Sequence, residues 1–219
     1  MATAKKIAVV TGTSRGLGVF IAKEFAANGW QVLGTGRSER SNDLSPEVKY
    51  HQFDASDAAA ASAFWEEVAS KYKGTEVCLV NNAGGYVGGA LVDTDPEAFI
   101  RQIESIYLSA VFMTRGLVSQ IAKARIINVV SAGALKANKN NSAYGAAKAA
   151  EMHFFQSLQA ELDSSKYQIT NLYPDMIASQ GSALNMIDAG ELANFIRQLA
   201  EADKSYYLPD VTISAKRQD

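Results

Sequence analysis

The sequence of 219 residues has only one cysteine, Cys78, together with two histidines and four prolines. A lone cysteine excludes an internal disulfide and any metal site built from several cysteines. With only two histidines, a zinc site is not expected either, and we predict no bound metal. Acidic and basic residues number 23 and 21, so the formal net charge of −2 provides no basic excess for binding nucleic acid.

Long hydrophobic runs are also missing. No stretch approaches the roughly 18 apolar residues that a membrane span requires, and the apolar run at residues 7–10 is too short for a secretory signal. We therefore expect a cytoplasmic protein with no membrane partner. Hydrophobic residues make up 47% of the chain and charged residues 20%, which excludes a disordered chain. With no linker or repeat in view, the length predicts one domain over residues 1–219.

Short β-rich runs alternate with longer helical patterns along the chain. This alternation predicts strands over 7–11, 31–36, 48–54, 76–81, 125–131, 167–173 and 206–214, and helices over 17–28, 57–72, 96–120, 142–163 and 188–201. Helices that separate consecutive strands imply right-handed crossovers and a parallel sheet covered on both faces. The predicted fold is a doubly wound Rossmann-type α/β sheet. Ligands in such sheets bind beyond the carboxyl ends of the strands.

A glycine cluster follows the first predicted strand and opens the first helix. Gly12 permits a tight turn, Gly16 lets backbone approach a pyrophosphate, and Gly18 lets the helix pack closely. The free N–H groups at the start of the helix would then meet the phosphates. A plain strand-to-helix turn also uses glycine, but the position at the first junction favours a dinucleotide. The predicted phosphate-binding residues are Gly12, Ser14, Arg15, Gly16, Leu17 and Gly18.

The end of the second predicted strand bears on the choice of cofactor. A carboxylate about 20 residues after the glycine cluster would bind the ribose 2′-hydroxyl of NAD, but this chain has Gly36 and Arg37 there. An arginine would pair with a 2′-phosphate, and Arg15 could assist. We therefore predict NADP(H) in preference to NAD(H). The alternative for Arg37 is a solvated surface residue.

Two further strand ends carry candidate cofactor contacts. Asp54 follows the third strand and could accept a hydrogen bond from an adenine amino group, or simply be a turn or helix-capping aspartate. Small residues after the fourth strand would let the chain pass close to a ribose, although alone they are an ordinary turn signal. These residues are Asn82, Ala83 and Gly84.

Three residues near the fifth strand could carry acid–base chemistry. Tyr144 and Lys148 lie four apart on one helix face, and Ser131 ends the strand before that helix. An unperturbed tyrosine has a pKa of about 10, and a neighbouring ammonium together with an oxidised nicotinamide favours the phenolate. Tyr144 could exchange a proton with a carbonyl oxygen, Ser131 could donate a hydrogen bond to it, and Lys148 could also hold ribose hydroxyls. Alone, a Tyr/Lys pair on a helix is commonplace.

Taken together, these patterns resemble the short-chain dehydrogenases/reductases. The resemblance rests on Thr11-Gly12-x-x-x-Gly16-x-Gly18, Asn81-Asn82-Ala83-Gly84, Ser131 and Tyr144-x-x-x-Lys148, in this order. It implies a seven-stranded sheet, a nicotinamide cofactor, and oxidation or reduction of a small alcohol or carbonyl substrate, with a homodimer or homotetramer as the assembly. It supports Asp54 near adenine and Arg15 with Arg37 as NADP determinants. It also implies that Pro174, Ile177 and Ser179 contact the nicotinamide.

The sequence departs from the family pattern at three places. Tyr107 stands where the family usually has an asparagine that completes a proton relay, and Asp175 stands where a glycine usually follows Pro174. The segment over 180–187, which often forms a longer lid in the family, is short. These departures keep open the alternative of a dinucleotide-binding scaffold with little activity. Four residues in loops near the predicted site are candidates for substrate contact, namely Tyr86, Leu135, Met176 and Met186.

Overall fold

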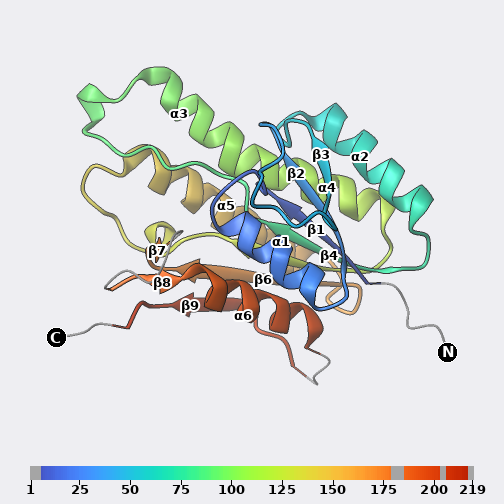
Figure 1. The fold of residues 1–219 in the computed structure, drawn as a ribbon. Helices are drawn as coiled ribbons and strands as arrows, with labels where there is room; N and C mark the ends of the chain where they lie inside the picture. The colour runs from blue at the N-terminus through green and yellow to red at the C-terminus, as the bar shows by residue number, and fades with distance from the viewer. Residues whose placement is uncertain (1–5, 179–184, 203–205, 217–219) are drawn as a thin grey trace.

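The computed structural model describes residues 6–178, 185–202 and 206–216. Its centre is a parallel sheet of seven strands in the order β3-β2-β1-β4-β5-β6-β9 (Figure 1). This order confirms the predicted doubly wound α/β fold. The strands are β1 (Lys6–Thr11), β2 (Gln31–Gly36), β3 (Lys49–Gln52), β4 (Glu76–Asn81), β5 (Ala124–Val129), β6 (Tyr167–Pro174) and β9 (Asp210–Ile213).

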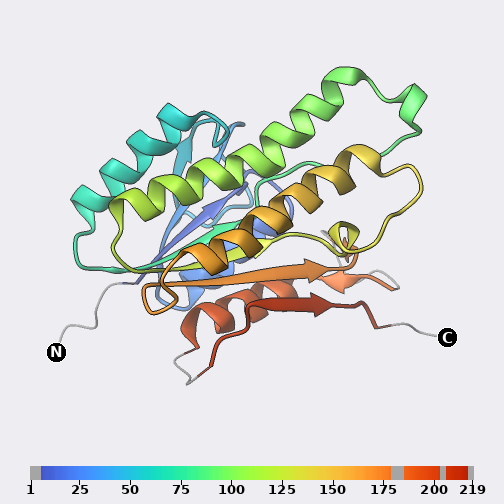
Figure 2. The ribbon, with the colours of Figure 1, turned by 180° about the vertical axis from the view of Figure 1, so that it is seen from behind.

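Helices cover both faces of the sheet (Figures 1 and 2). On one face, α1 (Leu17–Ala27) and α6 (Ala189–Glu201) pack side by side. The other face carries α2 (Ala58–Lys71), α4 (Ser109–Gln120) and α5 (Ser142–Glu161). Each face therefore has its own hydrophobic core.

The central strand β1 shows how the two cores arise from the sequence. Ala8 and Val10 belong to the core under α1 and α6, whereas Ile7 and Val9 belong to the core on the opposite face. Successive side chains of a strand point to opposite faces, and a strand buried on both sides must be apolar at every position. For this reason the two central strands are apolar without a break over 7–10 in β1 and over 77–80 in β4.

Side-chain caps define several helix ends. Asp57 accepts hydrogen bonds from the N–H groups of Ala59 and Ala60, which confirms it as the cap of α2. Asp188 caps α6 in the same way, one residue before the helix begins. Gly29 has a positive φ of 81° just after α1, so it stops that helix as predicted.

The region 96–120, predicted as one helix, is continuous but not uniform. It consists of α3 (Pro96–Gln102), the wider π-helical segment η2 (Ile103–Leu108) and then α4. Single-turn π segments inside helices occur frequently at functional sites. The apolar periodicity of the sequence carries no signal for such a change in winding.

Other differences are small. The third and last strands are shorter than predicted, and the structure adds the 3-10 turns η1 (Leu91–Asp93) and η3 (Ala132–Ala134). A separate two-stranded sheet joins β7 (Ile177–Ala178) to β8 (Ile187–Asp188). Two-residue strands are too short to leave a periodic pattern in the sequence.

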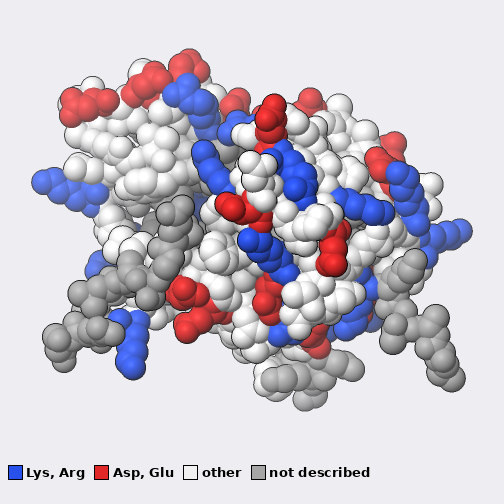
Figure 3. Space-filling model, in the orientation of Figure 1, with Lys and Arg blue, Asp and Glu red and all other residues white. Residues whose placement is uncertain are grey.

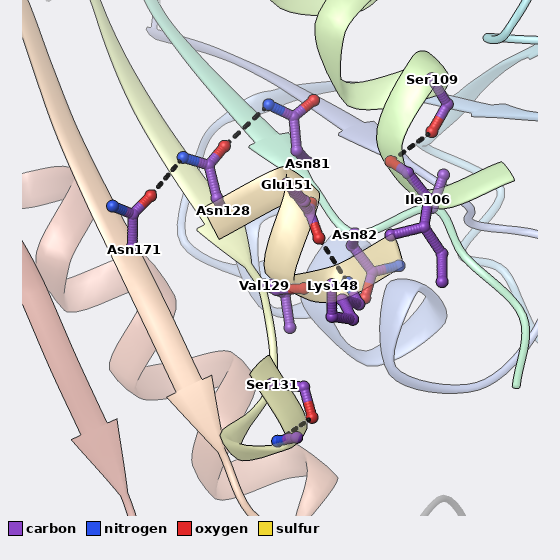
Figure 4. Close-up of polar contacts among 12 residues, drawn as sticks. Asn81, Asn82, Ile106, Ser109, Asn128, Val129, Ser131, Lys148, Glu151 and Asn171 are labelled. Carbon is purple, nitrogen blue, oxygen red and sulfur yellow. Dashed lines mark hydrogen bonds and ion pairs between the residues drawn. The ribbon is translucent and has the colours of Figure 1, made fainter. Parts of the chain in front are cut away.

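A row of buried amides links the strands on one side of the sheet centre. Asn81, Asn128 and Asn171 occupy matching positions of β4, β5 and β6. Asn81 Nδ2 donates to Asn128 Oδ1 at 2.9 Å, and Asn128 Nδ2 donates to Asn171 Oδ1 at 2.8 Å (Figure 4). Asn171 Nδ2 then donates to Asp210 of β9 at 3.2 Å. This amide ladder ties the four strands together close to the ends where the candidate site lies.

Candidate active site

The glycine loop between β1 and α1 is folded against the end of β4. Gly12 has a φ of 73°, and a Cβ there would lie 2.9 Å from Ala83 Cα. A Cβ on Gly18 would lie 2.2 Å from the Gly12 carbonyl oxygen. Both glycines are therefore required by close backbone contact, and Gly18 packs mainly against the loop itself.

Gly16 differs from its two neighbours because the space beside it is open. Its φ is 61°, and no atom lies within 4 Å of the position that a Cβ would take. Gly16 is also the N-cap of α1, with no side-chain hydrogen bond at the cap and no acidic residue in the first turn. A helix N-terminus with free N–H groups attracts phosphate. The loop therefore fits the pyrophosphate of a dinucleotide, which could approach Gly16 closely.

The residues expected near the adenosine half lie at the ends of β2 and β3. Arg37 Nη1 is 3.7 Å from Asp54 Oδ2, and the two side chains are 56% and 44% exposed. Gly36 is close to Ser14, whose Cβ and Oγ lie 3.5 Å from the position of a Cβ on Gly36. Arg15 is exposed on the loop. The strand ends thus bring Ser14, Arg37 and Asp54 into one region.

Residues 82–84 fasten the end of β4 to β1. The N–H groups of Asn82 and Ala83 donate to Thr11 Oγ1 at 3.0 and 2.9 Å, and Asn82 Nδ2 donates to the Thr11 carbonyl at 3.0 Å. Gly84 has a φ of 156°, and a Cβ there would touch Ile106 of η2 at 3.0 Å. The π-helical segment therefore supports the backbone that the sequence predicts at the cofactor ribose.

Gly133 lies between the two predicted proton-handling residues. A Cβ on Gly133 would lie 3.3 Å from Ser131 Oγ and 3.7 Å from Tyr144 Cε1. Ser131 Oγ accepts a hydrogen bond from the Gly133 N–H at 3.0 Å, so its own O–H is available to donate. The ring of Tyr144 meets that of Tyr86 edge to face at 5.2 Å. The structure thus places Ser131 and Tyr144 together, with Tyr86 beside them.

Lys148 lies one helical turn beyond Tyr144 and is buried, with 4% of its surface exposed. Its Nζ donates to the Val129 carbonyl at 2.7 Å and to Glu151 Oε2 at 2.8 Å (Figure 4). An ammonium has three N–H donors, so one remains for a ribose hydroxyl. The sequence analysis did not single out Glu151. Its spacing of seven from Tyr144 and three from Lys148 places it on the same helix face, and that was the available signal.

The predicted nicotinamide contacts are partly described. Pro174 is buried at the end of β6, and Ile177 is partly buried in β7. Ser179 and most of the predicted lid lie outside the described residues. Of the candidate substrate contacts, Tyr86, Leu135 and Met176 are 68%, 52% and 68% exposed. Met186 is partly buried just before β8.

Two of the three departures from the family pattern, Tyr107 and Asp175, have defined surroundings. The Tyr107 ring packs edge-on against Phe154, with ring centroids 6.0 Å apart. Phe154 follows Lys148 by six residues, about 9 Å along α5, so this ring contact lies beyond the lysine. Asp175 is exposed, and its N–H donates to the Ile213 carbonyl of β9 at 2.9 Å.

Comparison with known proteins decides the family. Residues 6–186 match the family model of the short chain dehydrogenases. The chain belongs to this family. As a short chain dehydrogenase, it is an oxidoreductase whose family binds a nicotinamide cofactor and acts on small molecules.

Relatives and solved structures of this family resemble the chain over most of its length. Dehydrogenase/reductase SDR family member 7B of Bos taurus is 31% identical over 84% of this chain, which spans 61% of the length of that relative. The 3-oxoacyl-(acyl-carrier-protein) reductase of Escherichia coli is 28% identical over 92% of both chains. A short-chain dehydrogenase/reductase of Vibrio parahaemolyticus superposes with a TM-score of 0.83 at 26% identity, over 97% of this chain and 98% of its own. An alcohol dehydrogenase of Thermococcus sibiricus, solved with 5-hydroxy-NADP, has a TM-score of 0.86 at 21% identity and covers 98% of both chains.

Proposed function

We propose that this short chain dehydrogenase is an NADP(H)-preferring oxidoreductase that interconverts a carbonyl compound and a secondary alcohol. The observation that carries the proposal is the meeting of Ser131 and Tyr144 around Gly133, with Lys148 one turn further along α5. We further propose that residues 1–219 form one domain in which cofactor and substrate share the carboxyl edge of the sheet.

The cofactor would be held by residues that follow three strands and by one residue of α5. The glycine loop would take the pyrophosphate at Gly16 and Ser14, Asn82 to Gly84 would border the ribose, and Lys148 would offer its remaining N–H to the ribose hydroxyls. Pro174, Ile177 and Ser179 would border the nicotinamide. When bound, the nicotinamide supplies or accepts the hydride.

Tyr144 would act as the general acid and base. In reduction, its O–H gives a proton to the carbonyl oxygen, and in oxidation its phenolate removes the proton of the alcohol. Ser131 would donate a hydrogen bond to the same oxygen, because its Oγ accepts from the Gly133 N–H and its own O–H has no acceptor among the described residues. Such a donor stabilises the charge that develops on that oxygen in the transition state.

The proposed preference for NADP(H) rests on the positive charges of Arg37 and Arg15. Arg37 and Arg15 are exposed beside the loop. Within the described residues, the Arg37 guanidinium makes only a long ion pair, with Asp54. A guanidinium matches a phosphate through two parallel hydrogen bonds. The 2′-phosphate would therefore bind at Arg37, while Asp54 would accept from the adenine amino group.

A thermal-shift titration with NADPH, NADH, NADP and NAD tests cofactor binding first. A ligand that binds only the folded protein raises the melting temperature according to its affinity. We expect the largest shift with NADPH. A shift with NADH alone would contradict the role of Arg37, and no shift with any of the four would contradict both the enzyme and the dinucleotide-binding scaffold. Binding of NADPH without turnover of any carbonyl compound would favour the scaffold.

Turnover is then tested with Tyr144→Phe on a panel of carbonyl compounds. Removing the proton donor should lower kcat by about 100-fold or more, while the melting shift with NADPH stays at its wild-type size. Tyr207→Phe is the matched control, because it removes a tyrosine hydroxyl from the exposed segment before β9, at the opposite end of the sheet. Unchanged turnover in Tyr144→Phe would overturn the assigned acid and base.

We also propose a cytoplasmic homodimer or homotetramer, in which the alanine-rich α5 supplies part of the interface. Among the described residues, no helix is both long and apolar enough to cross a membrane. On the face drawn in Figure 3, acidic and basic side chains are interspersed among uncharged ones. Light scattering of the purified protein and cell fractionation check the assembly and the location.

A further inference from the structure

The Lys148–Glu151 pair combines two opposite charges in a dry environment. The side chains of Lys148 and Glu151 are 5% and 1% exposed, and Nζ lies 2.8 Å from Oε2. Burying a carboxylate is costly unless it is paired and hydrogen-bonded. Other buried residues of α5, such as Ala147 and Phe155, are apolar. Glu151 is thus a charged residue on an otherwise mainly apolar face.

The pair also fixes the position of the Lys148 ammonium group. Nζ is held between Glu151 and the carbonyl of Val129, the last residue of β5. Figure 4 shows both contacts at the point where α5 crosses this strand end. Two of the three N–H donors are occupied, and one of the two acceptors is a backbone carbonyl of the sheet. A lysine without this carboxylate would have another donor for the cofactor or for Tyr144.

Glu151 changes the electrostatic balance at Tyr144 as well. An ammonium beside a phenol favours the phenolate, and a carboxylate that offsets the ammonium weakens this effect. Tyr144, Lys148 and Glu151 share one face, with Tyr144 and Glu151 two turns apart. We propose that Glu151 is a positioning residue that anchors the Lys148 ammonium under the end of β5 and offsets its charge, and so sets the pH at which Tyr144 releases its proton. This inference rests on the proposed function of Tyr144.

Several ionisable groups lie near this part of α5, and among them Lys148 is the one that acts on Glu151. The ionisable groups on the elements packed against it are Glu104 and Tyr107 on η2, Glu97 and Arg101 on α3, Arg115 on α4, and Tyr167 and Tyr173 on β6. The ring of Tyr86 also contacts Tyr144. Burial raises the pKa of Glu151, and the charge and hydrogen bond of Lys148 oppose that rise; no further group contributes. From β5 the group facing Nζ is the neutral Val129 carbonyl. Lys148 is thus the sole charge coupled to Glu151 in the described part of the chain.

The size of the expected effect follows from the spacing. Seven helical residues span about 10 Å. In a medium with an effective dielectric constant of about 20, a unit charge at that distance shifts the pKa of a titrating group by about one unit. Removing the negative charge makes the phenolate easier to form. Glu151→Gln should therefore lower the pH midpoint of Tyr144 by about one unit.

The first test needs neither cofactor nor turnover. Protein labelled with ¹³C at the tyrosine Cζ is titrated by NMR, and the Tyr144 resonance is assigned by its loss in Tyr144→Phe. We expect a lower midpoint in Glu151→Gln and a near wild-type midpoint in Glu151→Asp, which keeps the charge. Glu161→Gln, which removes an exposed carboxylate from the end of the same helix, should leave the midpoint unchanged. Equal midpoints in wild type and Glu151→Gln, or equal shifts in Glu151→Gln and Glu151→Asp, would overturn the proposal.

The second test follows the pH dependence of kcat in the same variants. Oxidation needs the phenolate, so its kcat rises with pH, whereas reduction needs the phenol, so its kcat falls with pH. In Glu151→Gln, the midpoints of both pH profiles should move to lower pH. If the wild type binds NADPH but turns over no carbonyl compound, the proposed function fails, and the NMR titration still decides the role of Glu151. Should Glu151→Gln not fold, Glu151→Met removes the same charge at similar length and carries the same expectation.

Discussion

Arg37 and Asp54 lie beyond the ends of two neighbouring parallel strands, with the guanidinium Nη1 3.7 Å from the carboxylate Oδ2. Both side chains are about half exposed, and pairs of this kind contribute at most about 1 kcal/mol to stability. The arginine can therefore turn to an incoming phosphate at little cost. The pair places a cation and an anion where the adenosine half of a dinucleotide is expected.

Replacing Arg37 with aspartate should reverse the preference of the protein for its cofactor. A charged hydrogen bond to phosphate contributes about 1.5–3 kcal/mol, so Arg37→Asp should weaken NADPH binding about 10- to 100-fold and leave NADH binding equal or better. Calorimetric titration with both cofactors measures this. Arg115→Asp, which makes the same change of charge at an exposed site on α4, should leave the preference as it is. A mutant that still prefers NADPH would exclude Arg37 as the determinant.

Gly18→Ala should destabilise the protein even though alanine is the better helix former. Helix propensity alone predicts a gain of about 1 kcal/mol. However, the new Cβ would lie 2.2 Å from the Gly12 carbonyl oxygen and 2.7 Å from Asn82 Nδ2, so the loop must shift. We expect a loss of about 1–3 kcal/mol in the free energy of unfolding. Urea denaturation checks this against Gly145→Ala in α5, where the nearest atom is 3.5 Å away. A gain in both variants would show that the loop has room to adjust.

Removing the centre of the amide ladder should cost stability through its neighbours. Asn128 is fully buried, and replacing it with leucine leaves Asn171 Oδ1 without its donor and Asn81 Nδ2 with only Thr114. A buried polar group that loses its partner costs about 1–3 kcal/mol. We expect Asn128→Leu to lower the free energy of unfolding by about 2–4 kcal/mol. The exposed Asn138→Ala should change it by less than about 0.5 kcal/mol, and a similar small change at Asn128 would contradict the ladder.

The thiol of Cys78 should make stability depend on pH in the alkaline range. Burial raises the pKa of this thiol from 9.0 to about 12. Between these values the unfolded chain loses the thiol proton while the folded chain keeps it, so stability present below about pH 9 is lost as the pH rises toward 12. The difference in unfolding free energy between wild type and Cys78→Val should therefore change with pH above 9 and stay constant below it. Alkylation of the native protein at pH 8 would contradict this burial.

The sequence alone predicted the fold and the edge of the sheet at which the candidate site residues lie. Mainly apolar strands that alternate with helices leave few arrangements other than a parallel sheet covered on both faces. In such a sheet, residues that follow the strands must gather at one edge. The glycine loop, Arg37, Asn82 and Ser131 could therefore be assigned to one edge before any contact was known.

Only the tertiary structure shows which residues the side chains at that edge contact. The π-helical turn under Gly84, the pairing of Arg37 with Asp54 and the row of asparagines from β4 to β6 join residues far apart in the chain. No local pattern carries such contacts. Tyr144 and Lys148 could be placed on one helix face from spacing alone, but the partner of the lysine could not. That Glu151 is buried against Nζ, instead of pointing to solvent, depends on how α5 is rotated against β5, and the packing of the whole core sets this rotation.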